Sequence, residues 1–145
     1  LVAEMKLIPI RDVIQGKRIV LCEDSIVRGT QLKNLTVQKL WENKARELHI
    51  RPACPPLMFP CKFLRSTRHI NELAARKAIH ALEGKYLEEI DAYLDDTSRQ
   101  YQTMEDWILR DLNVTTLRYQ RLDDMIQAIG LPREQLCLYC WTGQE

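Results

Sequence analysis

Two short apolar runs separated by a periodic segment organise the first third of the chain. Residues 17–22 contain a short apolar run with β-branched side chains at Ile19 and Val20, which predicts a strand buried on both faces, as in a parallel sheet. Apolar residues recur every three or four positions over residues 32–41, which predicts a helix that stops near Asn43. Residues 47–51 predict the next strand. This order indicates a right-handed βαβ unit in a parallel sheet.

The middle of the chain contains a proline-rich stretch, then segments with helical spacing, then a polar stretch. Prolines crowd residues 52–60, so this stretch is predicted to be an extended loop rather than a helix or a central strand. Helical spacing returns over residues 70–82 and again over residues 86–94. Residues 95–102 are polar, and we expect a loop there.

The last third is predicted to be mainly helical, with one further strand. Thr103 and Asp106 resemble a capping box that opens a helix ending near Leu112. Residues 115–119 predict a strand, and residues 122–129 predict a short helix. Together these elements predict an α/β fold, with a Rossmann-like parallel sheet and a helical C-terminal extension.

Composition narrows the class of protein. The 145 residues make up about one domain, and the hydrophobic share of 46% is enough for a core without disulfides. The 21 Lys and Arg against 20 Asp and Glu give a net charge of +1, which argues against a nucleic-acid-binding protein. No apolar run approaches the roughly 20 residues of a membrane span. The chain opens on Leu rather than Met, and we expect it to be part of a longer protein.

The most informative stretch joins the first strand to the helix that follows it. Glu23 and Asp24 come directly after the strand, at the edge where open α/β sheets bind ligands. Residues 25–30 lead into a helix N-terminus that favours an anion, and Gly29 allows a close backbone approach. Neither the Walker spacing nor the dinucleotide fingerprint is present. A sugar phosphate suits this arrangement, and an ordinary capped turn with two surface acids explains it equally well.

Residues 19–30 resemble the phosphoribosyl-pyrophosphate (PRPP) motif of type I phosphoribosyltransferases. The sequence of residues 24–30 most resembles the corresponding motif of the glutamine PRPP amidotransferase family. Residues 82–110 have no match in that family and are interpreted as an insertion. Further segments resemble the same family: Lys6–Arg11, Gly16–Arg18, Pro55–Pro56, Phe59–Cys61, Asn71–Ala74, Leu112–Gly130 and Cys137–Gly143.

The resemblance implies an enzyme that transfers glutamine-derived ammonia to PRPP, giving 5-phosphoribosylamine, glutamate and pyrophosphate in the first step of purine synthesis. Residues 1–81 would then be the C-terminal half of a phosphoribosyltransferase domain, and residues 82–145 a helical extension ending in Cys-x-x-Cys. We expect the N-terminal glutaminase domain of that family to lie outside this sequence, and we expect the isolated chain to be inactive. Two alternatives stay open: a non-catalytic PRPP- or nucleotide-sensing regulatory module, and a purely structural metal-binding fragment.

The resemblance also implies roles for individual residues. Glu23 and Asp24 would contact the ribose hydroxyls and the magnesium-bound PRPP. The residues that would cradle PRPP are Ser25, Ile26, Val27, Arg28, Gly29 and Thr30. The sequence departs from the family at Glu23, where a second aspartate is usual, and at Gln31, where a second threonine is usual. It departs again at residues 62–65.

The five cysteines suggest a reducing compartment and a use other than disulfides. Cys137 and Cys140, taken with Cys54 and Cys61 on the proline-rich loop, suggest a thiolate site for zinc or iron–sulfur. Small buried hydrophobes are the alternative, and Cys22 is expected to be core. The resemblance implies a four-iron four-sulfur cluster on Cys61, Cys137 and Cys140, with its fourth ligand upstream, although Cys54 could substitute.

Partners and location follow from the same resemblance. We expect purine nucleotides as feedback inhibitors, a homo-oligomer and a cytoplasmic location, without membrane or nucleic-acid partners.

Overall fold

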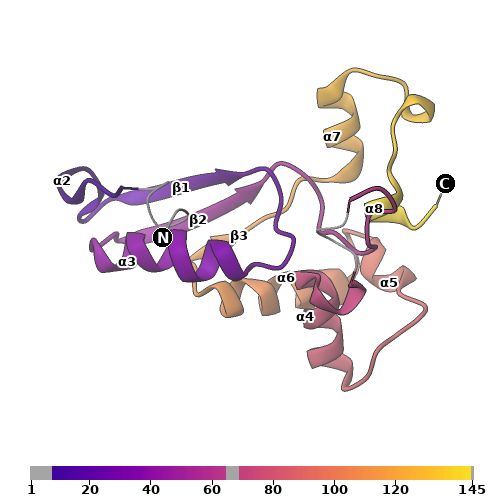
Figure 1. Ribbon diagram of the computed structural model, residues 1–145, viewed down its shortest axis with the longest axis horizontal. Coiled ribbons are helices and arrows are strands. Elements are labelled where there is room, and N and C mark those ends of the chain that lie inside the picture. The colour runs from indigo at the N-terminus through magenta and orange to yellow at the C-terminus, as the bar shows by residue number, and fades with distance from the viewer. Residues whose placement is uncertain (1–7, 65–68, 145) are drawn as a thin grey trace.

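The computed structural model describes residues 8–64 and 69–144 (Figure 1). Its centre is a three-stranded parallel sheet in the order β1-β2-β3, which confirms the predicted α/β class with a parallel sheet. The strands are β1 (Arg18–Glu23), β2 (Glu47–Pro52) and β3 (Thr116–Leu117). Lys6, Leu7 and Arg65, which belong to segments used for the resemblance, lie outside the described residues.

Helices connect and cover these strands. The crossover from β1 to β2 is helical, as the βαβ pattern predicts, although its first part is a π-helix. The helices are α2 (Arg11–Ile14), the π-helix η1 (Leu32–Val37), α3 (Gln38–Glu42), the 3-10 helix η3 (Ile70–Glu72), α4 (Ala74–Glu83), α5 (Asp91–Leu94), α6 (Arg99–Leu112), α7 (Leu122–Ile129), the 3-10 helix η4 (Arg133–Gln135) and α8 (Tyr139–Thr142).

Only one face of the sheet is packed in the described part of the chain. Ile19 pairs with Leu48 and Leu21 with Ile50 in the parallel register, and these four side chains face the core. Val20 points the other way and is 62% exposed. The prediction that β1 is buried on both faces is therefore wrong, because its side chains alternate between the helical layer and the open face.

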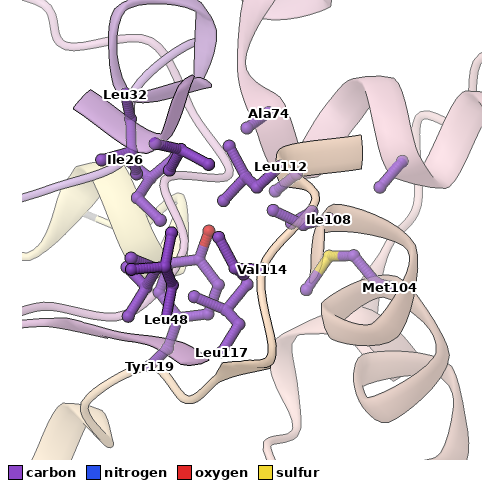
Figure 2. Packing of buried hydrophobic residues seen from close by; sticks show 14 of the residues in the cluster. Ile26, Leu32, Leu48, Ala74, Met104, Ile108, Leu112, Val114, Leu117 and Tyr119 are labelled. Carbon is purple, nitrogen blue, oxygen red and sulfur yellow. The ribbon is translucent and has the colours of Figure 1, made fainter. Parts of the chain in front are cut away.

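The core lies between the sheet and helix α6 (Figure 2). Leu48 and Leu117 from the sheet, and Met104 and Ile108 from α6, are each at most 1% exposed. Helix α4 packs on α6 with a face of alanines, which allows the two backbones to approach closely. Residues from both sides of position 81 thus share one core, and the division of the chain at that point stays a prediction.

Helix α6 starts earlier than the sequence predicts. The Ser98 side chain caps it by accepting a 2.9 Å hydrogen bond from the Tyr101 N–H. Thr103 is already inside the helix, where its hydroxyl donates to the carbonyl of Arg99 at 2.8 Å. The predicted capping box at Thr103 and Asp106 is therefore wrong. Several residues between 95 and 102 are polar because they line the exposed side of the first turn or lie before it.

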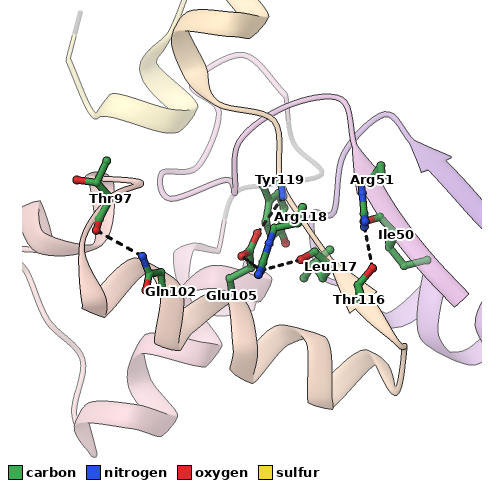
Figure 3. A network of polar contacts seen from close by, with 9 residues as sticks. All are labelled: Ile50, Arg51, Thr97, Gln102, Glu105, Thr116, Leu117, Arg118 and Tyr119. Atoms are coloured by element: carbon green, nitrogen blue, oxygen red, sulfur yellow. Dashed lines mark hydrogen bonds and ion pairs between the residues drawn. The ribbon is translucent and has the colours of Figure 1, made fainter.

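Strand β3 is shorter than predicted because its continuation pairs with a helix instead (Figure 3). The Tyr119 N–H donates to the buried carboxylate of Glu105 on α6 at 3.0 Å. The Arg118 guanidinium donates to the same carboxylate at 2.5 Å. The Arg118 N–H still donates to the Ile50 carbonyl of β2 at 3.2 Å, and from Tyr119 onward the backbone is bonded to α6 instead. Likewise, the helix predicted over residues 86–94 is reduced to α5.

Leu48 and Val20 provide a matched test of the one-sided sheet. We expect Leu48→Ala to lower the free energy of unfolding by about 2–5 kcal/mol, because it opens a cavity in the core. Val20→Ala changes an exposed position of the neighbouring strand and should cost less than about 1 kcal/mol. Urea denaturation followed by circular dichroism measures both. Equal losses in the two variants would contradict a sheet packed on one face.

Candidate functional site

The first part of the site is the pair of acids at the end of β1. The carbonyl of Glu23 accepts a 2.8 Å hydrogen bond from the Ala53 N–H, which fixes this strand end beside the chain leaving β2. Asp24 turns back on its own loop, where its Oδ1 accepts from the Ser25 N–H at 2.5 Å. Burial, and then the charge of Asp24, raise the pKa of the Glu23 carboxyl. The pair is therefore a place where a cation would relieve charge repulsion.

The second part is the loop after these acids, residues 25–30, in which three backbone carbonyls accept hydrogen bonds from other parts of the chain. The Val27 carbonyl accepts from the Ala74 N–H at 2.7 Å, and the Gly29 carbonyl accepts from the Lys33 N–H at 2.9 Å. The Lys77 ammonium lies 3.5 Å from the Arg28 carbonyl. In a trans peptide the N–H points opposite to the carbonyl. The N–H groups of residues 28–30 are therefore directed away from these anchors, as in the backbone nests that bind anions.

Gly29 is needed at its position because of its backbone conformation. Its φ of +76° lies in the left-handed region that side chains other than glycine rarely adopt. A Cβ placed there would make ordinary contacts with the side chains of Leu112 at 3.4 Å and Ile26 at 3.8 Å, so the torsion angle and not the space requires glycine. Ile26 is itself only 3% exposed, so it anchors the loop in the core rather than facing a ligand.

The third part is a cavity bordered by three thiols. Cys61, Cys137 and Cys140 line a hollow of about 730 Å³ together with residues of η4 and α8. Burial raises the pKa of the Cys140 thiol to about 11, and the neighbouring Cys61 and Cys137 add to this effect. Hydrogen bonds from the Phe63 and Leu64 N–H groups lower the pKa of the Cys61 thiol.

The three thiols meet because the C-terminal segment docks on the proline-rich loop. The Cys140 carbonyl accepts from the N–H groups of Met58 and Phe59 at 2.9 and 3.0 Å. The Trp141 indole N–H donates to the Pro55 carbonyl at 3.1 Å. In Figure 1, α8 accordingly lies next to the loop that leaves β2. The proline-rich loop is thus not a surface connection, because helix α8 packs against it.

The two remaining cysteines lie outside this group. Cys54 is buried, and burial raises the pKa of its thiol to about 11; the groups that interact with it are Trp141, Asp24, Tyr101 and Tyr119. Cys22 is exposed on the open face of β1, so the expectation that it is core is wrong. Its strand lacks a packing layer on that side in the described part of the chain.

Sequence reasoning did not single out the residues that brace the loop. Glu72, Ala74 and Lys77 contact residues 27 and 28 from η3 and α4. The signal was present only indirectly, since residues 71–74 carry part of the family resemblance. Their function depends on contacts across more than 40 positions, which periodicity does not report.

Comparison with known proteins gives a consistent result. No protein-family profile matches the chain. Amidophosphoribosyltransferase of Methanocaldococcus jannaschii is 32% identical over 144 residues, which is 99% of this chain and 25% of the relative. Amidophosphoribosyltransferase of Pyrococcus horikoshii is 45% identical over 92 residues, 62% of this chain and 20% of the relative.

Solved structures agree with the sequence relatives. The glutamine PRPP amidotransferase of B. subtilis, complexed with ADP and GMP, matches with a TM-score of 0.66 and 27% identity. The match covers 93% of this chain and 25% of the B. subtilis chain. A structure described as the allosteric regulatory enzyme of purine biosynthesis matches with a TM-score of 0.65.

The parallel sheet, with two acids and a braced loop at the end of its first strand, has the type I phosphoribosyltransferase fold. Within that class, the chain belongs to the amidophosphoribosyltransferase family. It spans about a quarter of the length of the relatives it matches, and corresponds to their C-terminal phosphoribosyltransferase portion.

Two further observations concern metals and membranes. Within residues 8–64 and 69–144, no three His, Cys, Asp or Glu side chains are placed to hold a single metal ion. Among the helices that the structure describes, none combines the length and hydropathy of a membrane span.

Gly143 provides a test of the docked C-terminal segment. A Cβ at this residue would lie 2.8 Å from the Phe59 ring, and its φ is +72°. We expect Gly143→Ala to loosen the segment and to speed hydrogen exchange of the Met58 and Phe59 N–H groups. Gly130→Ala is the control, because its φ is +75° but nothing lies within 4 Å of the new Cβ. Unchanged exchange in Gly143→Ala would contradict the contact.

Proposed function

We propose that the chain supplies the PRPP-binding part of an amidophosphoribosyltransferase, which uses glutamine-derived ammonia to convert PRPP into 5-phosphoribosylamine and pyrophosphate. The observation that carries this proposal is the loop after β1, in which three successive carbonyls are tied to the protein. Their peptide N–H groups are thereby turned toward a ligand. A phosphate is the ligand that such a row of N–H groups suits best.

Each part of the site has a distinct task in this reaction. Residues 25–30 hold the 5-phosphate of PRPP. The carboxylates of Glu23 and Asp24 hold the ribose hydroxyls, and their negative charge stabilises the positive charge that develops on the ring as pyrophosphate leaves. Fixing both ends of the sugar also orients C1 for attack by ammonia.

Mg²⁺ fits the acid pair by donor chemistry, since carboxylate oxygens are the ligands it prefers. Glu23 and Asp24 would hold the ion together with PRPP, and the ion supplies charge neutralisation of the pyrophosphate. Burial, and then the charge of Asp24, raise the pKa of Glu23, and a bound cation would offset both effects.

A four-iron four-sulfur cluster fits the cavity lined by Cys61, Cys137 and Cys140. Thiolates are the protein ligands of such clusters, and the three thiols border one hollow of about 730 Å³. The fourth ligand would come from a segment that precedes residue 1 in the family. Cys54 does not fill that role in this proposal, because it is buried beside Trp141 and Asp24.

Regulation and assembly are proposed from the relatives. The B. subtilis enzyme is described in complex with ADP and GMP, which supports purine nucleotides as feedback inhibitors. A glutaminase domain and a homo-oligomeric enzyme complete the assembly. The cysteines of the described residues form no disulfide, which supports a reducing, cytoplasmic location. A purely nucleotide-sensing role is not favoured, because the relatives carry the name of the enzyme.

The phosphate role of the loop is tested with ribose 5-phosphate, which presents the phosphate and ribose hydroxyls without the pyrophosphate. We expect ribose 5-phosphate with Mg²⁺ to shift the ¹H–¹⁵N resonances of Gly29 and Thr30 in a saturable manner. Asp24→Asn should weaken this binding by about tenfold, since it removes a charge beside the ribose. Asp123→Asn, an exposed acid on α7, is the matched control and should bind as the parent does.

The outcome of that titration is decisive for the loop. Saturable shifts at Gly29 and Thr30 support the proposal. Shifts that spread over surface lysines, or no shift at high millimolar ligand, would overturn it.

The cluster is tested by iron and acid-labile sulfide analysis of protein purified anaerobically with dithiothreitol, which offers a fourth thiolate. We expect both elements in the parent, and we expect Cys61→Ser, Cys137→Ser and Cys140→Ser each to lose them. Cys22→Ser should keep them, because Cys22 lies on the open face of β1. Iron that survives the Cys137→Ser change would rule out this ligand set.

A further inference from the structure

The phosphate loop, residues 25–30, forms an ion pair with a segment that lies 44 positions further along the chain. Glu72, the last residue of η3, reaches Arg28 in the middle of the loop. Its Oε2 accepts from the Arg28 Nε at 2.6 Å and from the Arg28 Nη2 at 2.5 Å. Two donors of one guanidinium thus converge on a single carboxylate oxygen, which fixes the direction of the arginine side chain.

This ion pair is too exposed to matter much for global stability. The side chains of Arg28 and Glu72 are 43% and 45% exposed, and pairs of this kind add little to the free energy of folding. Lys33 and Asp111 form a second pair with nearly the same exposure, 43% and 42%, at 2.7 Å. That pair links η1 to α6, whereas the Arg28–Glu72 pair ends on the loop itself.

Arg28 lies between the peptide groups whose N–H groups are directed at the ligand. Its backbone torsions set the angle between its own N–H and the N–H of Gly29. A side chain held at its far end restricts those torsions, in addition to the bonds from Ala74 and Lys77 to the neighbouring carbonyls. The same pairing draws the guanidinium toward η3, so that the loop offers its backbone to the phosphate.

We propose that Glu72 is a positioning residue for the phosphate of the substrate, acting through Arg28. It touches no reacting atom; it keeps the loop backbone in the geometry that the phosphate requires. The proposal rests on the proposed function of the loop. It extends the site from residues 23–30 to η3, a segment that the strand-and-loop motif does not include.

The test is a double-mutant cycle on binding of ribose 5-phosphate with Mg²⁺, measured by calorimetry and by the Gly29 resonance. We expect Glu72→Ala to weaken binding by about fivefold, because misplaced donors lose affinity steeply. Glu72→Gln retains one acceptor and should lose less. In an Arg28→Ala background, Glu72→Ala should have no further effect. Asp111→Ala is the matched control, with parental affinity.

Thermal denaturation accompanies each titration. The three Glu72 and Asp111 variants should melt within a few degrees of the parent, so that a loss of affinity in Glu72→Ala alone reports on the loop rather than on folding. Parental or tighter binding by Glu72→Ala would overturn the positioning role, as would additive losses in the double variant. If the parent itself fails to bind ribose 5-phosphate, the proposed function fails instead.

Discussion

The hydrogen bonds at the two ends of residues 53–59 connect the acid pair at the end of β1 to the cavity lined by the three thiols. At one end the Ala53 N–H donates to the Glu23 carbonyl, which places the chain beside the acid pair. At the other end Met58 and Phe59 donate to the Cys140 carbonyl, which brings in the thiol cavity. A segment without regular secondary structure therefore spans the distance between the two parts of the site, and most of it is buried.

This arrangement connects the half-buried C-terminal helix to the segment beside the acids. The Trp141 indole holds the Pro55 carbonyl, and the same side chain is hydrogen-bonded to the thiol of Cys54, which lies near Asp24. Any group bound at the thiol cavity is thus connected to the acid pair through packed, hydrogen-bonded backbone.

The helices and strands were largely predictable from the sequence, whereas their burial and their contacts with distant segments were not. Residues 18–23, 47–52 and 122–129 form close to where their patterns predict, because local propensity and burial agree there. The alternation of exposed and half-buried side chains along β1 could not be foreseen, because an apolar run does not reveal whether one or both faces of the sheet are covered. The start of α6 was missed because the Ser98 cap precedes polar residues that conceal the helical period. The Arg28–Glu72 contact is non-local, and spacing within either segment does not report it.

The register between β1 and β2 has a consequence for stereochemistry. Ile19, Leu21 and Glu23 occupy the same face of β1, so the pairing that buries the two aliphatic side chains also decides on which side the carboxylate projects. A slip of one residue would bury Val20 and turn Glu23 to the opposite face. Hydrophobic packing several residues away therefore selects the face of the sheet from which the Glu23 carboxylate can meet a ligand.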